Sequence, residues 1–206
     1  MYLITTLQLA NAARVTEFES YLLSLAAAAG DFPGLLYGSV VNSLGQPAKF
    51  ATVYVWETEA SFQAFFRSPN RTGLVKTTEG IFTRLEPHQV YELQATVGLG
   101  LASTDPRFVT LAEWTLDEHG EEAFVSDQLG LLEVEEQHDP LFAGGEVWRY
   151  LGSPGRYIVT RSLRGQPAGD AVPAVRAFRQ GHPQAMYSSV APTVEQYRVV
   201  GIVRGS

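Results

Sequence analysis

Three residues with ligand-binding side chains, Thr52, Tyr54 and Trp56, alternate along one predicted strand in the first half of the chain. Alternate residues of a strand share one face, so these side chains point the same way. An indole ring stacks on flat ligands while its N–H holds a polar group, and Thr6 joins this face if the first strand pairs alongside. The pattern predicts a pocket for a small aromatic molecule. Cross-strand packing is the alternative that the same residues allow.

A candidate proton acceptor lies further along the chain. His88 is the one imidazole in the first half, and it would act as a general base if it faced the pocket, because the pKa of histidine is normally near neutrality. It follows Glu86 and Pro87, which favours an exposed loop. The candidate pocket also includes two aromatic residues on the inward side of a predicted helix. Its members are Thr6, Thr52, Tyr54, Trp56, Phe62, Phe66 and His88, and no catalytic residue is assigned.

An acidic cluster raises the question of a metal site. Four carboxylates and one imidazole gather at the end of a predicted helix, at Glu133, Glu135, Glu136, His138 and Asp139. The usual helical ligand spacings, His-x-x-x-His and His-x-x-x-Glu, are absent from this cluster. We therefore expect a solvated acidic face and no metal.

Composition excludes several classes of function. The 206 residues carry a net charge of −7 without a cluster of Lys or Arg, so the chain repels the phosphates of nucleic acid. It contains no cysteine, which excludes disulfides, thiolate nucleophiles and cysteine-bound metals. No phosphate-binding loop, nucleophile elbow or dinucleotide fingerprint occurs. The expected partner is a small molecule, with no cofactor.

The N-terminal residues indicate a strand and not a targeting signal. Met1 to Leu9 is apolar in alternation, and no basic residue precedes Arg14. No apolar run approaches the roughly 20 residues that a membrane span needs. We expect a soluble cytoplasmic protein without a membrane partner. Its edge strands leave room for a homodimer of the whole chain.

A repeat relates the two halves of the chain. Residues 44–50 (LGQPAKF) return 107 positions later as residues 151–157 (LGSPGRY), both with the frame Leu-Gly-x-Pro-x-basic-aromatic. The same offset pairs Gly38 with Gly145. Gly and Pro in such a frame reverse the chain between two strands, so each copy predicts a β-hairpin. A repeat of about 100 residues indicates a duplicated domain.

The elements around each hairpin occur in the same order. In the first copy, apolar residues step by three and four from Val15 to Ala29, which predicts a helix that Gly30 ends. Thr58 caps a second helix, which stops at Ser68-Pro69. The predicted strands of this copy are 2–9, 36–43, 49–56 and 90–97. The second copy predicts strands at 108–115 and 196–203, a hairpin at 146–163, and helices at 120–137 and 172–178.

This order predicts an α+β fold of two tandem ferredoxin-like modules, at residues 1–98 and 106–206, joined by the Gly- and Pro-containing segment 98–106. In strand 50–56, both alternate sets of side chains are apolar, so both faces of the sheet need cover. We therefore expect the two antiparallel sheets to pack face to face within one chain, as an intrachain pseudo-dimeric α+β barrel.

The run from Val55 to Pro69 resembles the antibiotic biosynthesis monooxygenase family of dimeric α+β barrels, in which a strand ending in Trp precedes a helix of the type Ala/Ser-Phe-x-x-aromatic and then Ser-Pro. The resemblance begins at Pro33-Gly34 and covers most of the first half. In the second half, Leu163-Arg164-Gly165 replaces Trp56 and its neighbours. The resemblance implies an oxygenase-like protein that acts on or binds a small aromatic or polyketide-like molecule, with a pocket near Trp56.

The same resemblance implies two kinds of chemistry. In the antibiotic-tailoring branch, a deprotonated polyphenol reduces dioxygen without metal or flavin, and the Asn that this branch has four residues before the Trp is Thr52 here. In the haem-degrading branch, catalysis uses an Asn and an iron-binding His, which fall near Leu7 and Leu74 here. Haem binding or degradation is thus one alternative, and a non-catalytic ligand-binding module is another.

Overall fold

The computed structural model describes residues 1–75, 78, 80–103, 106–117, 120–166, 172–182 and 187–205. The chain forms two compact units: a first unit of Met1–Val90 with Tyr197–Ser206, and a second unit of Tyr91–Gln196. Both units combine helices with antiparallel strands, which confirms the predicted α+β class and the tandem copies. None of the described helices has the length and apolar character that crossing a membrane requires.

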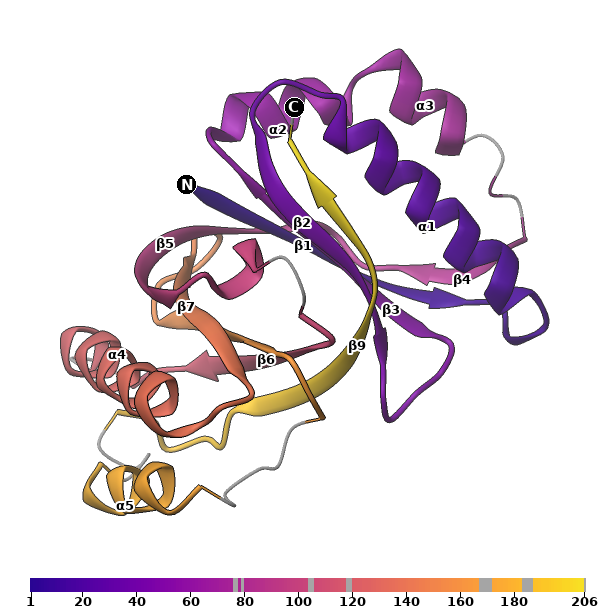
Figure 1. Ribbon diagram of the computed structural model, residues 1–206. Coiled ribbons are helices and arrows are strands. Elements are labelled where there is room, and N and C mark those ends of the chain that lie inside the picture. Colours follow the sequence, from indigo (N-terminus) through magenta and orange to yellow (C-terminus); the bar gives the residue numbers. More distant parts are fainter. Residues whose placement is uncertain are drawn as a thin grey trace. The chain divides into compact units, whose positions relative to one another are not determined.

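The first unit is an antiparallel sheet with its helices on one side (Figure 1). Neighbouring strands follow the order β9-β2-β3-β1-β4, and β9 (Thr193–Arg204) contributes its residues from Tyr197 onward. The other elements of this unit are β1 (Tyr2–Ala10), η1 (Ala12–Arg14), α1 (Val15–Gly30), β2 (Leu35–Ser43), β3 (Lys49–Trp56), α2 (Glu59–Phe66), α3 (Pro69–Val75) and β4 (Phe82–Leu85).

The core of the first unit follows the predicted apolar pattern. The inward residues Phe18, Leu22 and Ala29 of α1 are fully buried and pack with Phe50 and Trp56 of β3. Every residue from Phe50 to Trp56 is buried. The prediction that both faces of this strand are covered is therefore confirmed.

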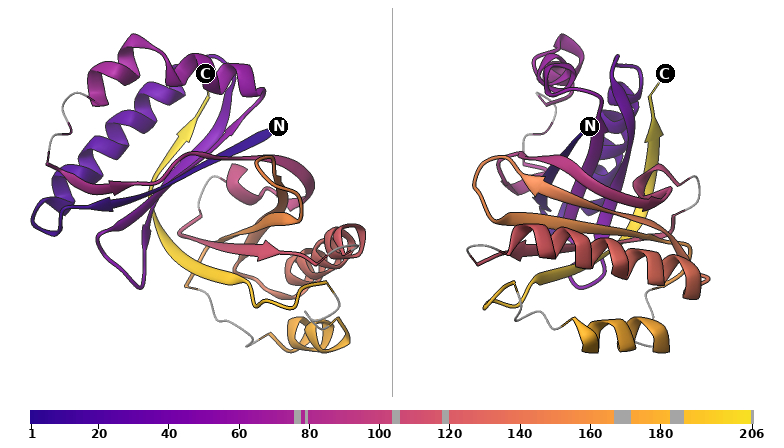
Figure 2. Two further views of the ribbon diagram at one scale, coloured as in Figure 1. Left: turned by 180° about the vertical axis from the view of Figure 1, so that it is seen from behind. Right: turned by 90° about the vertical axis from the view of Figure 1, so that its left-hand side faces the viewer.

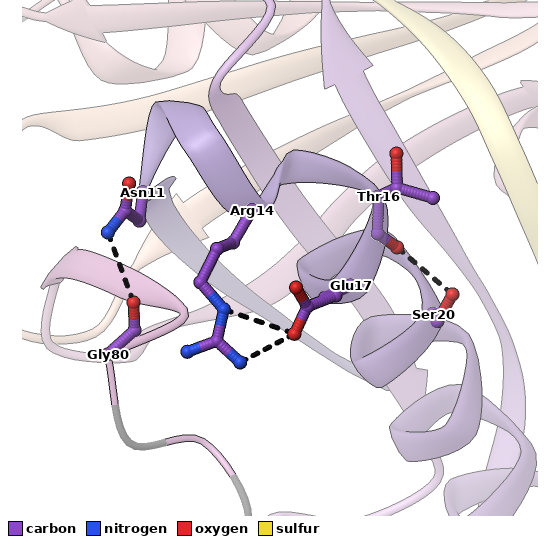
Figure 3. A network of polar contacts seen from close by, with 6 residues as sticks. All are labelled: Asn11, Arg14, Thr16, Glu17, Ser20 and Gly80. Atoms are coloured by element: carbon purple, nitrogen blue, oxygen red, sulfur yellow. Dashed lines mark hydrogen bonds and ion pairs between the residues drawn. The ribbon is translucent and has the colours of Figure 1, made fainter.

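A polar network fixes the start of α1 (Figure 3). The side chain of Asn11 accepts a hydrogen bond from the Ala13 amide and donates one to the carbonyl of Gly80, just before β4. One turn on, the Arg14 guanidinium forms an ion pair with Glu17 at 2.5 Å. An exposed ion pair of this kind adds less than about 1 kcal/mol. The Asn11–Gly80 bond matters more for the site, because it ties the segment that precedes β4 to the helix start.

The second unit repeats this architecture (Figure 2). Its strands follow the order β6-β8-β7-β5, and helices α4 and α5 lie beside one another. Its elements are β5 (Gln89–Gly98, shared with the end of the first unit), η2 (Gly100–Ala102), β6 (Phe108–Thr115), α4 (Glu121–His138), β7 (Phe142–Tyr150), β8 (Arg156–Leu163) and α5 (Pro173–Gly181). The repeated Leu-Gly-x-Pro frame forms the turns of the β2–β3 and β7–β8 hairpins, as predicted.

The last strand of each copy differs from the sequence expectation. The strand predicted to close the first copy pairs from Tyr91 to Gly98 with β7, in the second unit. Conversely, residues Tyr197–Arg204 of β9 pair with β2, in the first unit. Exposed edge strands are templates for pairing, and β2 and β7 each gain a partner this way. The predicted domain boundary at 98–106 follows the order of elements along the chain. The two compact units instead divide between residues 90 and 91 and between residues 196 and 197. Residues 104 and 105 of the predicted connector lie outside the described residues.

Candidate functional site

Six of the seven predicted pocket residues line one cavity in the first unit, which we call the first cavity. Its volume is about 60 Å³, and it lies between the helices and strands β1, β3 and β4. The predicted residues that line it are Thr6, Thr52, Tyr54, Phe62, Phe66 and His88. The alternation along β3 and the pairing of Thr6 with Thr52 place Thr6, Thr52 and Tyr54 along one wall of this cavity.

His88 is half-buried in this cavity, so the expectation of an exposed loop histidine is wrong. The pairing of β1 with β4 continues to Glu86, whose amide donates to the Leu7 carbonyl at 2.9 Å, and this holds the following residues against β1. As a result, Nδ1 of His88 lies 2.5 Å from the Thr6 hydroxyl. The ring centroids of Phe62 and Phe66 lie 5.7 and 4.5 Å from the centroid of the imidazole, and both pairs are T-shaped.

The surroundings of His88 keep its imidazole neutral. Burial, and to a smaller extent the positive charge of Arg71, lower its pKa from 6.5 to about 4. The Arg71 guanidinium stacks on the Phe66 ring at 3.7 Å and donates to the Phe66 carbonyl. The imidazole is therefore neutral at physiological pH and has a ring nitrogen that can accept a hydrogen bond or a proton.

Tyr54 brings a polar group to the same wall. Its hydroxyl is buried and has no hydrogen-bond partner among the described residues. Burial also raises its pKa above the usual range, so the phenol stays protonated. A buried hydroxyl without a partner costs about 1–3 kcal/mol. Tyr54 is therefore able to donate to an oxygen atom of a bound molecule.

Trp56, the predicted centre of the pocket, does not line the first cavity. The side chain is fully buried, its ring stacks on Phe65 with centroids 5.4 Å apart, and it meets Phe32 edge-on. The indole nitrogen has no hydrogen-bond partner within the described part of the chain. The structure therefore places Trp56 in the aromatic core that supports the cavity wall.

A larger cavity lies within the second unit, and sequence reasoning missed it. This second cavity has a volume of about 540 Å³ and lies between helices α4 and α5 and the strands β6 and β8. Its walls include Trp114, Leu131, Phe178 and Tyr187. A volume of roughly 300–1,000 Å³ is typical of small-molecule sites. On size alone, the second cavity accommodates a larger ligand than the first.

A buried ion pair lines the second cavity. Glu135 of α4 accepts a hydrogen bond from Nε of Arg161 of β8 at 2.8 Å, with side chains only 8% and 12% exposed. Arg179 of α5 approaches the same carboxylate at 3.7 Å. The expectation of a solvated acidic face is therefore wrong for Glu135, because its position on α4 faces the sheet, whereas Glu133 and Glu136 are exposed. The signal was available in the repeat, since Arg161 stands 107 positions after the inward-facing Tyr54.

The described residues offer no ready site for a metal ion or for haem. Among the described residues, no group of three or more His, Asp or Glu side chains lies close enough to hold a metal ion. Haem does not fit the first cavity, because the macrocycle far exceeds a volume of about 60 Å³.

Comparison with known proteins assigns the N-terminal segment. Residues 1–76 match the family model of the antibiotic biosynthesis monooxygenases. This part of the chain is a domain of that family. The antibiotic biosynthesis monooxygenase domain spans β1 to α3 and supplies most of the first cavity, whereas His88 follows the matched residues. No curated protein matches the chain.

Solved structures extend the similarity to the whole chain. A proposed monooxygenase from Fusobacterium nucleatum is 9% identical, with a TM-score of 0.77 over 98% of this chain and 94% of its own. A second, from Lactobacillus acidophilus, is 13% identical, with a TM-score of 0.72 over 98% and 96%. An anthrone oxidase-like protein is 14% identical, with a TM-score of 0.67 over 100% and 93%. At these identities the likeness shows the fold.

Proposed function

We propose that this protein is a cofactor-independent, monooxygenase-like enzyme that acts on a small aromatic molecule in the first cavity. The observation that carries the proposal is the neutral imidazole of His88, held by Thr6 among aromatic rings within and beside the family-matched domain. Oxygenation without a cofactor requires a substrate whose carbanion is stable enough to reduce dioxygen. A base in a water-poor aromatic cavity favours that deprotonation.

The proposed reaction converts an activated CH₂ group into a carbonyl. His88 takes a proton from the carbon atom, and the carbanion transfers electrons to dioxygen. The peroxide anion that forms at that carbon takes the proton back from His88, and the hydroperoxide then loses water, so that CH₂ and O₂ give C=O and H₂O. During these steps, the Tyr54 hydroxyl is available to donate to the substrate oxygen on which negative charge gathers.

The volume of the first cavity limits the substrate. About 60 Å³ holds a few atoms, and a ring enters only if the wall recedes. Phe66 and Leu85 line the cavity and are partly or largely exposed, so their side chains have room to turn outward. Replacement of Phe66 with Ala should therefore increase kcat/KM for a multi-ring substrate. Replacement of a fully buried residue of the same cavity should not.

The test uses anthrone, the compound in the name of one structural neighbour, with ¹⁸O-labelled dioxygen. We expect oxygen uptake and one ¹⁸O atom in the new carbonyl of the product. His88→Gln should lower kcat by about a hundredfold or more, the usual contribution of a general base. The acid limb of the wild-type pH profile should lie near 4, the pKa of the buried imidazole, and not near 6.5.

The control is His138→Gln, which changes an exposed imidazole at the end of α4. It should leave the rate unchanged. A His88→Gln variant with the wild-type rate would show that His88 is not the base. No enzyme-dependent oxygen uptake by the wild-type protein with anthrone, or with the Phe66→Ala variant, would overturn the proposed function.

A second candidate is a ligand-binding protein without turnover. The small volume of the first cavity favours it, because binding of a few atoms needs no rearrangement. Native mass spectrometry of protein purified from its own cells distinguishes the two. A retained, chemically unchanged molecule in the absence of oxygen uptake supports this second candidate, and the same spectra report whether chains pair.

A further inference from the structure

The second cavity contains polar groups that the protein leaves without partners. Arg161 lines this cavity and uses its Nε atom for Glu135. The Oε1 atom of Gln128 and the Nε1 atom of Trp114 are buried without partners in the described part of the chain. Because each buried, unmatched group costs about 1–3 kcal/mol, a bound molecule that satisfies them gains affinity.

The guanidinium of Arg161 is a cationic group on the cavity wall that an anionic oxygen of a ligand would suit. The guanidinium of Arg161 lies 2.8 Å and that of Arg179 lies 3.7 Å from the carboxylate of Glu135. Asp139 also lines the cavity, but one of its oxygens already accepts from the Leu141 amide. The planar fork of a guanidinium matches a carboxylate better than any other anion of similar size except phosphate.

The walls favour a flat ring. Phe178 and His182 line the cavity and stack on one another, with ring centroids 4.2 Å apart and an interplanar angle of 14°. Trp114 and Tyr187 form a T-shaped pair at 5.8 Å on another part of the wall. Offset and edge-to-face contacts with such rings stabilise a bound aromatic molecule. The unpartnered oxygen of Gln128 would accept a hydrogen bond from a donor on that molecule, such as a hydroxyl group.

The charged pair is not a requirement of the fold. Arg161 pairs with Thr110 in the β6–β8 ladder, as Tyr54 pairs with Ile4 in the β1–β3 ladder. Glu135 occupies the buried helical position that Ala29 occupies in the first unit, 106 residues earlier. The same architecture therefore forms with Tyr and Ala at these positions. A buried ion pair is weak evidence for stability, so its presence on the cavity wall points to recognition.

We propose that the second cavity is a binding site for a hydroxylated aromatic carboxylate, with the carboxylate on Arg161 and the hydroxyl group toward Gln128. The family match ends at residue 76, so this site lies outside the matched domain. The inference does not depend on the proposed oxygenation in the first cavity.

The test is isothermal titration calorimetry with 6-hydroxy-2-naphthoate, a flat two-ring probe. We expect saturable one-to-one binding, and at least about tenfold weaker binding of its methyl ester, which lacks the charge that a guanidinium recognises. Fluorescence of the indole of Trp114 gives an independent signal, because it lines the cavity. Equal affinity for acid and ester would overturn the assignment of a carboxylate.

A double variant tests the residues. Glu135→Ala with Arg161→Tyr installs the residues of the first unit and removes both charges together, so no lone charge stays buried. We expect a tenfold to hundredfold loss of affinity, roughly the contribution of hydrogen bonds to a charged group, with an unchanged circular dichroism spectrum. If the double variant does not fold, Gln128→Leu, which carries the first unit's residue at that position, tests the same cavity. Wild-type affinity in a folded variant would overturn the proposal.

The matched control is Arg176→Ala, which removes an exposed positive charge from the same helix α5 without changing the cavity wall. It should bind the probe like the wild-type protein. Loss of binding in this control would show that general charge attraction, and not the cavity, holds the probe. Loss of oxygen uptake in His88→Gln concerns the proposed function alone and leaves this inference standing.

Discussion

The two units carry the same framework with different interiors. In the first unit, Ala29, Tyr54 and Trp56 fill the space between helix and sheet and leave a cavity of about 60 Å³. In the second unit the corresponding positions are Glu135, Arg161 and Leu163, and the cavity has a volume of about 540 Å³. The second unit therefore has Leu163 in place of the indole of Trp56, and a charged pair in place of Ala29 and Tyr54. These differences accompany the change from a packed aromatic core to a cavity of ligand size. The comparison teaches that the family motif marks the packing of its module and not the location of the larger of these two cavities.

Trp56→Ala should give the largest effect on this comparison. The indole is fully buried against Phe65 and Phe32, so its removal should lower the free energy of unfolding by about 3–5 kcal/mol. Leu163→Ala, at the corresponding position beside the larger cavity, should cost less. Urea denaturation of both variants measures the difference. Equal losses would mean that the two interiors are packed alike.

Arg161→Ala should be the next most disruptive change. It leaves the carboxylate of Glu135 buried with Arg179 at 3.7 Å as its remaining cationic neighbour, which should cost about 3 kcal/mol. Adding Glu135→Ala should recover most of that loss, because the unpaired charge disappears. Denaturation of the single and double variants checks the prediction. A double variant as unstable as the single one would show that packing, and not charge, sets the cost.

The stability of the two units should depend on pH in opposite directions. Glu146 of the second unit is buried and accepts from Leu101 and Thr160, and burial raises its pKa from 4.5 to about 7. The folded state therefore holds this proton more tightly than the unfolded state, so stability falls as the pH rises from 4.5 to 7. The first unit has Ser39 at the position that corresponds to Glu146.

His88 gives the first unit the opposite dependence. Its folded pKa lies below the unfolded value, so stability falls as the pH drops from 6.5 toward 4. In the wild-type protein the two slopes offset each other between pH 4.5 and 6.5. The free energy of unfolding of Glu146→Gln should therefore rise with pH over this range, because only the contribution of His88 is left. That of His88→Gln should fall with pH, because only the contribution of Glu146 is left. Thermal melts across this range would contradict the assignment if either variant kept the wild-type profile.

Tyr54→Phe should have the smallest effect. The hydroxyl that it removes has no partner among the described residues, so the change in stability should stay within about 0.5 kcal/mol or favour the variant. The contrast with Arg161→Ala at the corresponding position sharpens the distinction between the two units. A loss of more than 1 kcal/mol in calorimetry would show that the Tyr54 hydroxyl makes a stabilising contact.

Sequence reasoning was most successful where local rules decide. The helix from Val15 to Gly30, the two hairpins and the convergence of Thr6, Thr52 and Tyr54 follow from periodicity and turn chemistry. It failed for α3 and β4, two short elements without strong patterns. It also misjudged His88 and Glu135, because loop and helix composition do not reveal which segment lies against them.

The sequence by itself determined the duplicated α+β plan, because alternation, helical periodicity and the repeated Leu-Gly-x-Pro turns act over a few residues. Only the tertiary structure decided which side chains share a cavity, that β5 pairs with β7 and β9 with β2, and that Trp56 supports a wall instead of forming it. These outcomes depend on packing between residues distant in sequence, where the volume of one side chain sets the space left for a ligand.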